Sequence, residues 1–132
     1  MPQVSLLATL VATVLSFVLG GLWYGPLFAK AWMEENKLTT ETLTQRFNPV
    51  RQYGLTFVIS ALASYVLGFF LGPDPGVGYA VGTGLAAGVF WVAGAFATSY
   101  LFEGRTMRHF LINAGYHVVQ FGLIGLAFGL LG

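Results

Sequence analysis

The sequence predicts an all-α, polytopic membrane protein built as a bundle of four transmembrane helices. Charged residues make up 8% of the 132-residue chain, against about 25% in an average soluble protein. The mean hydropathy is +0.74, and most of the few charges lie between long apolar stretches. A water-soluble surface with so little charge would expose large apolar patches, so we expect the outer surface to face lipid.

The first predicted helix covers about residues 4–25. Val4 to Tyr24 carries no charge, and a crossing takes about 20 residues at a rise of about 1.5 Å each. A cleavable signal peptide is the alternative for an amino-terminal apolar stretch. This stretch has no basic region before it, is too long, and carries bulky aromatics where small residues precede cleavage. We therefore expect a transmembrane helix.

Aromatic and basic residues mark the end of this first helix. Trp23 and Tyr24 precede Pro26, which stops the helix, and Lys30 and Trp32 follow. Trp and Tyr gather where hydrocarbon meets headgroups, because their rings are apolar and their polar groups seek water. A lysine stem runs along the same boundary while its ammonium stays hydrated. We predict that Trp23, Tyr24, Lys30 and Trp32 are interface anchors.

A cytoplasmic loop is expected over about residues 26–48, with a short amphipathic segment lying in the membrane interface. Four apolar side chains share one face of that segment: Leu27, Phe28, Ala31 and Trp32. A second short helix is predicted after Thr39, a plausible N-cap. It should end near Asn48, because the residue before Pro49 is driven out of the helical region.

The remaining helices are predicted at about residues 49–71, 78–102 and 107–131. Asn48 and Pro49 suit the N-cap and first position of the second helix. The segment 72–76, Gly-Pro-Asp-Pro-Gly, is a strong turn signal before the third. Residues 1–132 are thus expected to form a single integral membrane domain.

The positive charges predict the orientation. Both groups of basic residues follow an odd-numbered helix: Lys30, Lys37, Arg46 and Arg51 after the first, and Arg105 and Arg108 after the third. Four crossings place these two groups on one side. The positive-inside rule then puts both basic loops in the cytoplasm and both termini outside the cell membrane.

Rows of small residues are the candidates for helix packing, since helices in lipid associate by close approach through small side chains. The rows are Ser60, Ser64 and Gly68 in the second helix, Gly84 and Gly88 in the third, and Gly125 and Gly129 in the fourth. They serve packing either within the chain or between protomers. Because four short helices leave small-residue faces over, we expect a homo-oligomer or a membrane-complex partner.

One polar stripe runs down the fourth helix. Asn113, His117 and Gln120 share a face, with Tyr116 beside them and His109 at the interfacial end. Polar groups at this depth need partners, so the stripe should face other helices, a cavity or a bound molecule.

Three roles are open for the stripe. It forms a hydrogen-bond network, lines a cavity for a small molecule or ion, or supplies His117 as the axial ligand of a haem or chlorophyll. The partners expected for a network are Thr9, Thr13 and Ser16 of the first helix or Tyr65 of the second.

Several chemistries lack their residues in this chain. No Asp or Glu lies inside a predicted span, as ion-coupled transport usually requires. Cysteine is absent, and neither histidine stands in a metal-binding motif. We expect no catalysis, no metal site and no nucleic-acid partner.

Two segments resemble a known family. GGLWYGPLFAKAWM at residues 20–33, and LFEGR followed by INAGYH within residues 101–117, are similar to a bacterial membrane-protein family called domain of unknown function 1761. The resemblance covers nearly the whole chain. It implies a small polytopic protein of the bacterial inner-membrane type and no assigned activity.

The leading functional hypothesis is a non-catalytic integral membrane protein that acts by helix–helix association, as a homo-oligomer or an accessory subunit of a membrane complex. The alternative is a small transporter or channel for a neutral or lipid-like solute, with a cavity lined by the polar stripe. A haem- or chlorophyll-binding subunit is the third.

Overall fold

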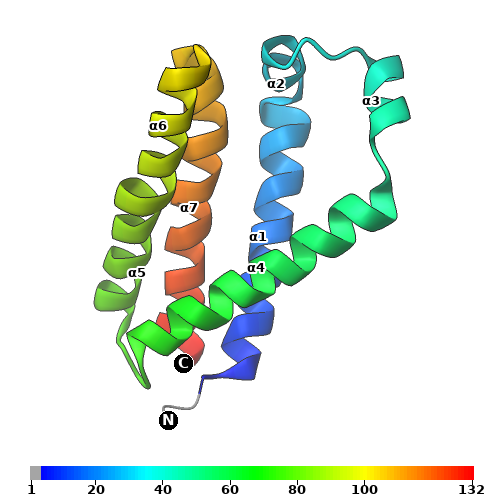
Figure 1. The fold of residues 1–132 in the computed structure, drawn as a ribbon. Coiled ribbons are helices and arrows are strands. Elements are labelled where there is room, and N and C mark those ends of the chain that lie inside the picture. The colour runs from blue at the N-terminus through cyan, green and yellow to red at the C-terminus, as the bar shows by residue number, and fades with distance from the viewer. Residues whose placement is uncertain (1–3) are drawn as a thin grey trace.

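The computed structural model describes residues 4–132, and in that range the regular structure is entirely helical (Figure 1). The all-α, four-helix prediction is confirmed. Four helices are long and apolar enough to cross a membrane: Leu6–Leu27, Pro49–Leu71, Val77–Glu103 and Met107–Leu131. The predicted ranges were 4–25, 49–71, 78–102 and 107–131, so the sequence placed all four helices and displaced only their ends.

Two of the long helices are interrupted. The first consists of α1 (Leu6–Leu22) and the π-helical segment η1 (Trp23–Leu27), where the chain kinks at Gly25, with φ −98° and ψ −106°. Pro26 follows the kink directly. The third consists of α5 (Val77–Ala86), the π-helical segment η2 (Ala87–Ala93) and α6 (Gly94–Glu103). The second and fourth, α4 (Pro49–Leu71) and α7 (Met107–Leu131), are continuous.

The loop between the first two long helices contains α2 (Ala29–Glu35) and α3 (Thr40–Arg46). Four helices begin at a side chain that accepts the backbone N–H three residues on, namely Ser5, Thr39, Asn48 and Thr106. Such caps satisfy N–H groups that have no partner inside the helix. The predicted caps at Thr39 and Asn48 are confirmed.

The tightest contact in the molecule joins α5 to α7, with backbone against backbone. A Cβ at Gly84 would collide with the carbonyl oxygen of Phe121, and one at Gly125 with the carbonyl oxygen of Ala80. A Cβ at Gly88 would lie 2.9 Å from the Cα of Val118. This is the close approach that small residues four apart permit between helices in lipid.

The same pattern continues to the end of the pair, where a Cβ at Gly129 would lie 2.7 Å from the Cα of Val77. The rows predicted in the third and fourth helices therefore face each other within one chain. They leave no small-residue face of their own for a partner protein.

The row on α4 is also used within the chain. Ser60 and Ser64 are buried, and a Cβ at Gly68 would strike the ring of Phe128 on α7. Near this crossing a small apolar core collects side chains of α1, α4, α5 and α7: Ala8, Ala12, Leu67, Leu71, Ala80, Ile124, Ala127 and Phe128.

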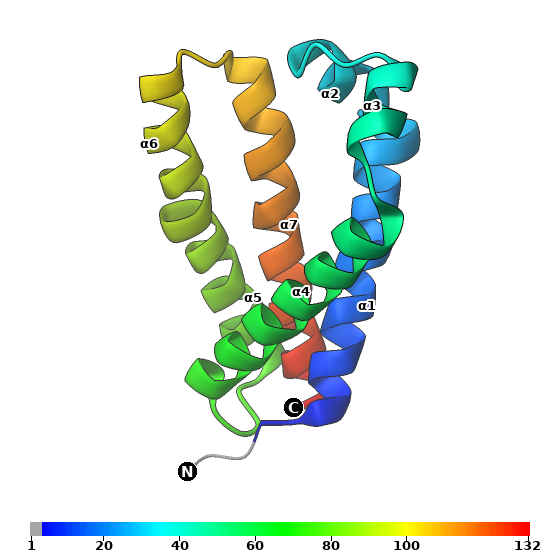
Figure 2. The ribbon, with the colours of Figure 1, turned by 45° about the vertical axis from the view of Figure 1, so that its right-hand side comes forward.

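The helix α4 crosses the other long helices obliquely, as both ribbon views show (Figures 1 and 2). Its carboxyl-terminal half lies on the core, whereas its amino-terminal half extends away from α1 toward α3. There the rings of Tyr53 and Phe57 stand 6.5 and 5.7 Å from the ring of Phe17. These bulky rings hold α4 farther from α1 than Ser60 and Ser64 do nearer the carboxyl-terminal half of α4. The space between the two helices therefore widens toward α3.

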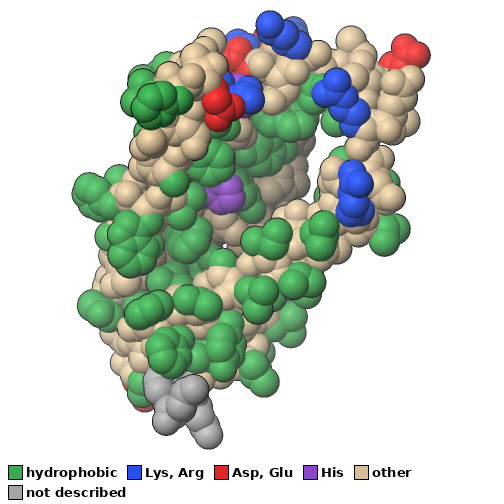
Figure 3. Space-filling view, in the orientation of Figure 1, with side chains coloured by type: hydrophobic (Ala, Val, Ile, Leu, Met, Phe, Trp, Pro, Cys, Tyr) green, Lys and Arg blue, Asp and Glu red, His purple; other side chains and the backbone are tan. Residues whose placement is uncertain are grey.

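The end of the molecule that carries α2 and α3 is closed by ion pairs. Arg108, at the start of α7, lies 3.1 Å from Glu34 and 3.5 Å from Glu35 of α2, and Thr106 hydrogen-bonds Glu35. The Lys and Arg side chains visible in Figure 3 gather at this end. Large apolar side chains such as Phe90, Trp91 and Ile59 are exposed on the outside of the long helices, as expected for a lipid-facing surface.

Candidate functional site

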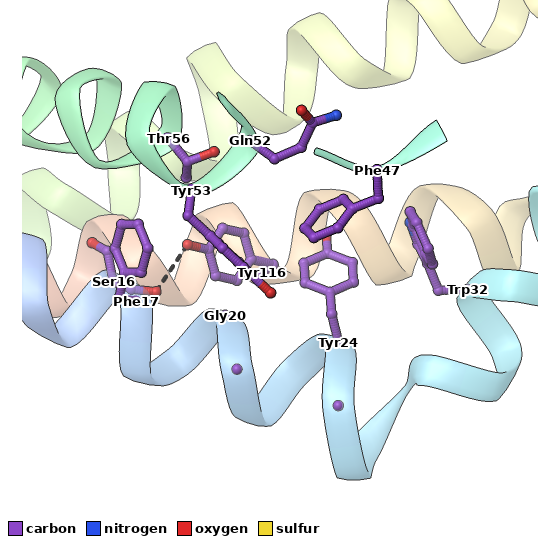
Figure 4. A pocket seen from close by; sticks show the side chains of 12 residues that line it. Ser16, Phe17, Gly20, Tyr24, Trp32, Phe47, Gln52, Tyr53, Thr56 and Tyr116 are labelled. Atoms are coloured by element: carbon purple, nitrogen blue, oxygen red, sulfur yellow. Dashed lines mark hydrogen bonds between the residues drawn. The ribbon is translucent and has the colours of Figure 1, made fainter. Parts of the chain in front are cut away.

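A cavity of about 550 Å³ lies between α1 and the amino-terminal half of α4 (Figure 4). It is lined by residues of α1, η1, α2, the α3–α4 linker, α4 and α7: Ser16, Phe17, Gly20, Gly21, Tyr24, Gly25, Trp32, Phe47, Gln52, Tyr53, Thr56 and Tyr116. Half of these side chains are aromatic. No charged residue lines it.

On the α1 side, the cavity is bordered by Gly20 and Gly21, which have no side chains to fill it. A Cβ at Gly21 would meet no atom within 4 Å, and one at Gly20 would only touch the ring of Tyr116 at 3.6 Å. The two glycines leave room beside α1 that larger side chains would fill. The volume of the cavity therefore depends on their lack of side chains.

The aromatic wall is assembled from distant parts of the chain. The kink after Tyr24 allows its ring to contact Trp32 of α2 at 5.9 Å and Tyr116 of α7 at 5.5 Å between centroids. Phe47, in the linker before α4, stands edge-on to Tyr53 at 5.3 Å. The rings thus form two groups of the lining, one made by Tyr24, Trp32 and Tyr116 and the other by Phe17, Phe47 and Tyr53.

The two tyrosine hydroxyls of this wall are already bonded to the protein. The Tyr116 hydroxyl donates to the backbone carbonyl of Ser16 at 3.0 Å, and the Tyr24 hydroxyl donates to Asn113 Oδ1 at 2.8 Å. Their rings rather than their hydroxyls are presented to the cavity. A guest in this part of the cavity therefore meets chiefly apolar surface.

Behind the wall, a polar network ties the first, third and fourth long helices together. Asn113 accepts from Tyr24 and donates through Nδ2 to the Tyr100 hydroxyl of α6 at 2.7 Å. Trp23 Nε1 donates to the carbonyl of Ile112 at 2.7 Å. The Ile112 carbonyl lies within the intact helix α7, and it can accept this additional bond because a carbonyl oxygen has two lone pairs.

His117 and Gln120 behave differently from Asn113. His117 Nδ1 and Gln120 Oε1 are 2.7 Å apart on the same helix, and the imidazole stacks on the Phe96 ring at 5.3 Å. Neither side chain lines the cavity. Of the predicted stripe, Tyr116 lines this cavity, whereas Asn113, His117 and Gln120 do not.

The partners expected for the network also need correction. Thr9 and Thr13 donate to carbonyls of their own helix, at Ser5 and Thr9, and Tyr65 points outward and is 42% exposed. Ser16 takes part only through its backbone carbonyl, since its hydroxyl donates to Ala12. Short hydroxyl side chains in a helix reach the preceding turn more easily than a neighbouring helix.

Two sequence interpretations at the helix ends change as well. Trp23 and Tyr24 direct their polar groups to Ile112 and Asn113 of α7 rather than to headgroups. Lys30 is exposed, as an anchor requires, while Trp32 is half-buried beside the cavity. His109, expected at the interface, is 4% exposed and packs edge-on against Tyr100 at 5.1 Å.

Sequence reasoning missed Phe17, Phe47, Gln52, Tyr53 and Thr56. They come from two helices and a linker, and no spacing along the chain marks them as neighbours. Only the tilt of α4 brings them together. Within residues 4–132, no group of three His, Asp or Glu side chains is placed to hold a metal ion.

The fold and this site define the class: a small all-helical protein of the multi-pass membrane type, with an aromatic cavity at one end of its bundle. Over residues 7–129 the chain matches the family described as "Protein of unknown function (DUF1761)", and it belongs to that family. The resemblance predicted from its two segments is thereby confirmed. No curated protein and no solved structure matched the chain.

We predict that Asn113→Leu destabilises the fold more than His117→Leu. The first change leaves Tyr24 and Tyr100 on two other helices without their partner, and should lower the free energy of unfolding by about 1–2 kcal/mol. The second removes a bond within α7 and should cost less than about 1 kcal/mol. Unfolding in detergent, followed by circular dichroism, measures both. Equal losses, or a larger loss for His117→Leu, would contradict the assignment of the network to Asn113.

Proposed function

We propose that this protein is a non-catalytic membrane protein that binds a lipid-like molecule in the cavity between α1 and α4. The observation that carries the proposal is the cavity itself, which has a volume of about 550 Å³ and is lined by uncharged residues, half of them aromatic. Ligand sites commonly enclose about 300–1,000 Å³ and are lined mainly by apolar and aromatic side chains. The cavity is large enough for one small molecule or a length of acyl chain.

The lining favours a lipid-like guest over an ion or a sugar. No Asp, Glu, Lys, Arg or His contributes to it, and the hydroxyls of Tyr24 and Tyr116 are bonded to the protein. A strongly polar guest would lose its hydration and gain few bonds in return, since Gln52, Tyr53 and Thr56 offer the remaining polar side chains of the lining apart from Ser16. An apolar chain entering from the surrounding lipid loses little. This supports the lipid-like solute of our second sequence hypothesis, with a different set of lining residues.

Trp32 offers a test of occupancy, because its ring lines the cavity. In a protein carrying Trp32 as its sole tryptophan, in vesicles of phosphatidylcholine with brominated acyl chains, bromine should quench Trp32 fluorescence. Gly21→Leu should reduce that quenching, since the new side chain occupies free space in the cavity. The measurement is the fluorescence ratio between brominated and ordinary vesicles.

Two controls separate cavity from surface. Gly54→Leu adds the same side chain at another helical glycine with no neighbour within 4 Å and outside the cavity lining, and should leave Trp32 quenching unchanged. A protein with Trp91 alone, 75% exposed on the lipid-facing surface, reports ordinary lipid contact and should not respond to Gly21→Leu. Unquenched Trp32, or equal quenching in the Gly21→Leu and Gly54→Leu variants, would refute the proposal.

We also propose an orientation with α2, α3 and the 104–106 connection in the cytoplasm and both termini outside. All six Lys and Arg residues belong to the two loops and adjoining helix ends on one side of a four-span topology. The turn between α4 and α5 carries Asp74 and no basic residue. Basic residues flanking spans are retained on the cytoplasmic side.

Cysteine labelling in intact cells tests this orientation without background, because the chain has no natural cysteine. Asp74→Cys should react with a membrane-impermeant maleimide from outside. Thr40→Cys should react only after the membrane is permeabilised. The opposite pattern would overturn the orientation.

Self-association is the second candidate function, and a different surface now supports it. Gly78 and Gly82 on α5 have no neighbour within 4 Å of an added Cβ. They border a groove of about 620 Å³ between α4 and α5, next to the exposed rings of Phe90 and Trp91. Glycines four residues apart permit close approach of a helix from a second copy. The haem or chlorophyll hypothesis gains no comparable geometric support at His117.

We predict that Gly82→Leu weakens such an assembly, because the branched side chain fills the groove. Energy transfer between copies labelled at Thr40→Cys, reconstituted in vesicles, measures it. Gly54→Leu is the matched control and should transfer as the parent does. A parent without energy transfer, or equal transfer in both variants, would rule out this surface.

A further inference from the structure

The edge of the cavity near the start of α4 carries a cation. Gln52 lines the cavity, and its Oε1 accepts a hydrogen bond from Arg51 Nε at 3.0 Å. This bond joins the exposed Arg51 guanidinium to a residue of the lining. Arginine presents those nitrogens as a planar fork that fits the oxygens of a phosphate or carboxylate.

A second arginine lies five residues earlier in the chain. Arg46 ends α3 and Arg51 belongs to the first turn of α4, and between them lies Phe47, another residue of the cavity lining. The positive end of the α4 dipole adds to this field. The space-filling view shows Lys and Arg side chains over α3 and the start of α4, around the opening beside that helix (Figure 3).

The carboxylates of the chain are engaged or placed elsewhere. Glu34 and Glu35 pair with Arg108, and Glu103 pairs with Arg105. Among residues 4–132, the ion pairs involve neither Arg46 nor Arg51. Glu41 lies in the first turn of α3. Asp74 lies in the turn before α5, which is at the other end of the bundle. The edge of the cavity thus has positive charge without an internal counter-ion.

We infer that the guest is an anionic lipid whose acyl chain occupies the aromatic cavity and whose headgroup is bound by Arg51, with Arg46 contributing charge. The inference rests on the proposed function and adds the chemical class of the ligand. An apolar cavity with Arg51 bonded to one of its lining residues, and with no described carboxylate paired to Arg51 or Arg46, matches an amphiphile with one negative end. A free phosphate would satisfy the arginines but leave the 550 Å³ cavity empty.

The test compares two lipids that differ in headgroup charge. Protein with Trp32 as its sole tryptophan is placed in ordinary phosphatidylcholine vesicles that contain a small, equal fraction of brominated phosphatidylglycerol or brominated phosphatidylcholine. The anionic lipid should quench Trp32 with an apparent affinity about fivefold higher, the preference that one basic residue provides at a membrane surface. Arg51→Gln should abolish most of this preference, and Arg51→Lys should keep most of it.

Arg105→Gln is the matched control, because it removes the same charge from an exposed arginine in the other basic loop. It should retain the preference, and helicity by circular dichroism confirms that each variant is folded. A preference lost equally in both arginine variants would indicate general surface attraction and overturn the inference. So would displacement of the anionic lipid by inorganic phosphate.

Failure of the inference is distinct from failure of the proposed function. Equal quenching by the two lipids, still sensitive to Gly21→Leu, would refute the anionic headgroup and leave lipid binding in place. Quenching that ignores Gly21→Leu would refute both. If Arg51→Gln does not fold, the parent protein still gives a test. The preference for the anionic lipid measured at Trp32 is then compared with the preference measured at Trp91, which reports only the lipid around the protein. Equal preferences at the two positions would refute the inference.

Discussion

The contact between the backbones of α5 and α7 is the interaction on which the rest of this structure depends. In lipid there is no hydrophobic driving force between apolar helices, so close packing must supply the attraction. Gly84 and Gly125 allow that packing by bringing each helix against a carbonyl oxygen of the other. The pair then forms a rigid wall on which the first two long helices dock.

The helix α7 serves two kinds of contact on its two sides. Glycines face α5, while Asn113 and Tyr116 face the kinked end of the first helix. Trp23 and Tyr24 make this second contact at the end of α1, just before the kink at Gly25. Polar side chains that would be costly in lipid are thereby paired, and they fix how the two halves of the bundle meet.

The cavity results from the change in side-chain size along α4. Where α4 presents Ser60 and Ser64 it lies close to the core, and where it presents Tyr53 and Phe57 it is held away. One helix thus changes from a packing element to the wall of a cavity along its length. Its first turn then brings Arg51 to the edge of that site, which joins apolar volume and positive charge in one place.

The sequence alone determined the helices, their caps and the membrane class. Low charge, long apolar stretches and residues such as Asn48 and Pro49 act locally, so they can be interpreted without the fold. It also identified Asn113 and Tyr116 as polar groups that needed partners. It named Ser16, whose backbone carbonyl accepts from Tyr116, but it did not name Tyr24 and Tyr100, which are the partners of Asn113. The cavity was decided only by the tertiary structure. Its lining depends on the tilt of α4, which follows from how bulky and small side chains meet between helices, a relation that no periodicity along a single helix contains.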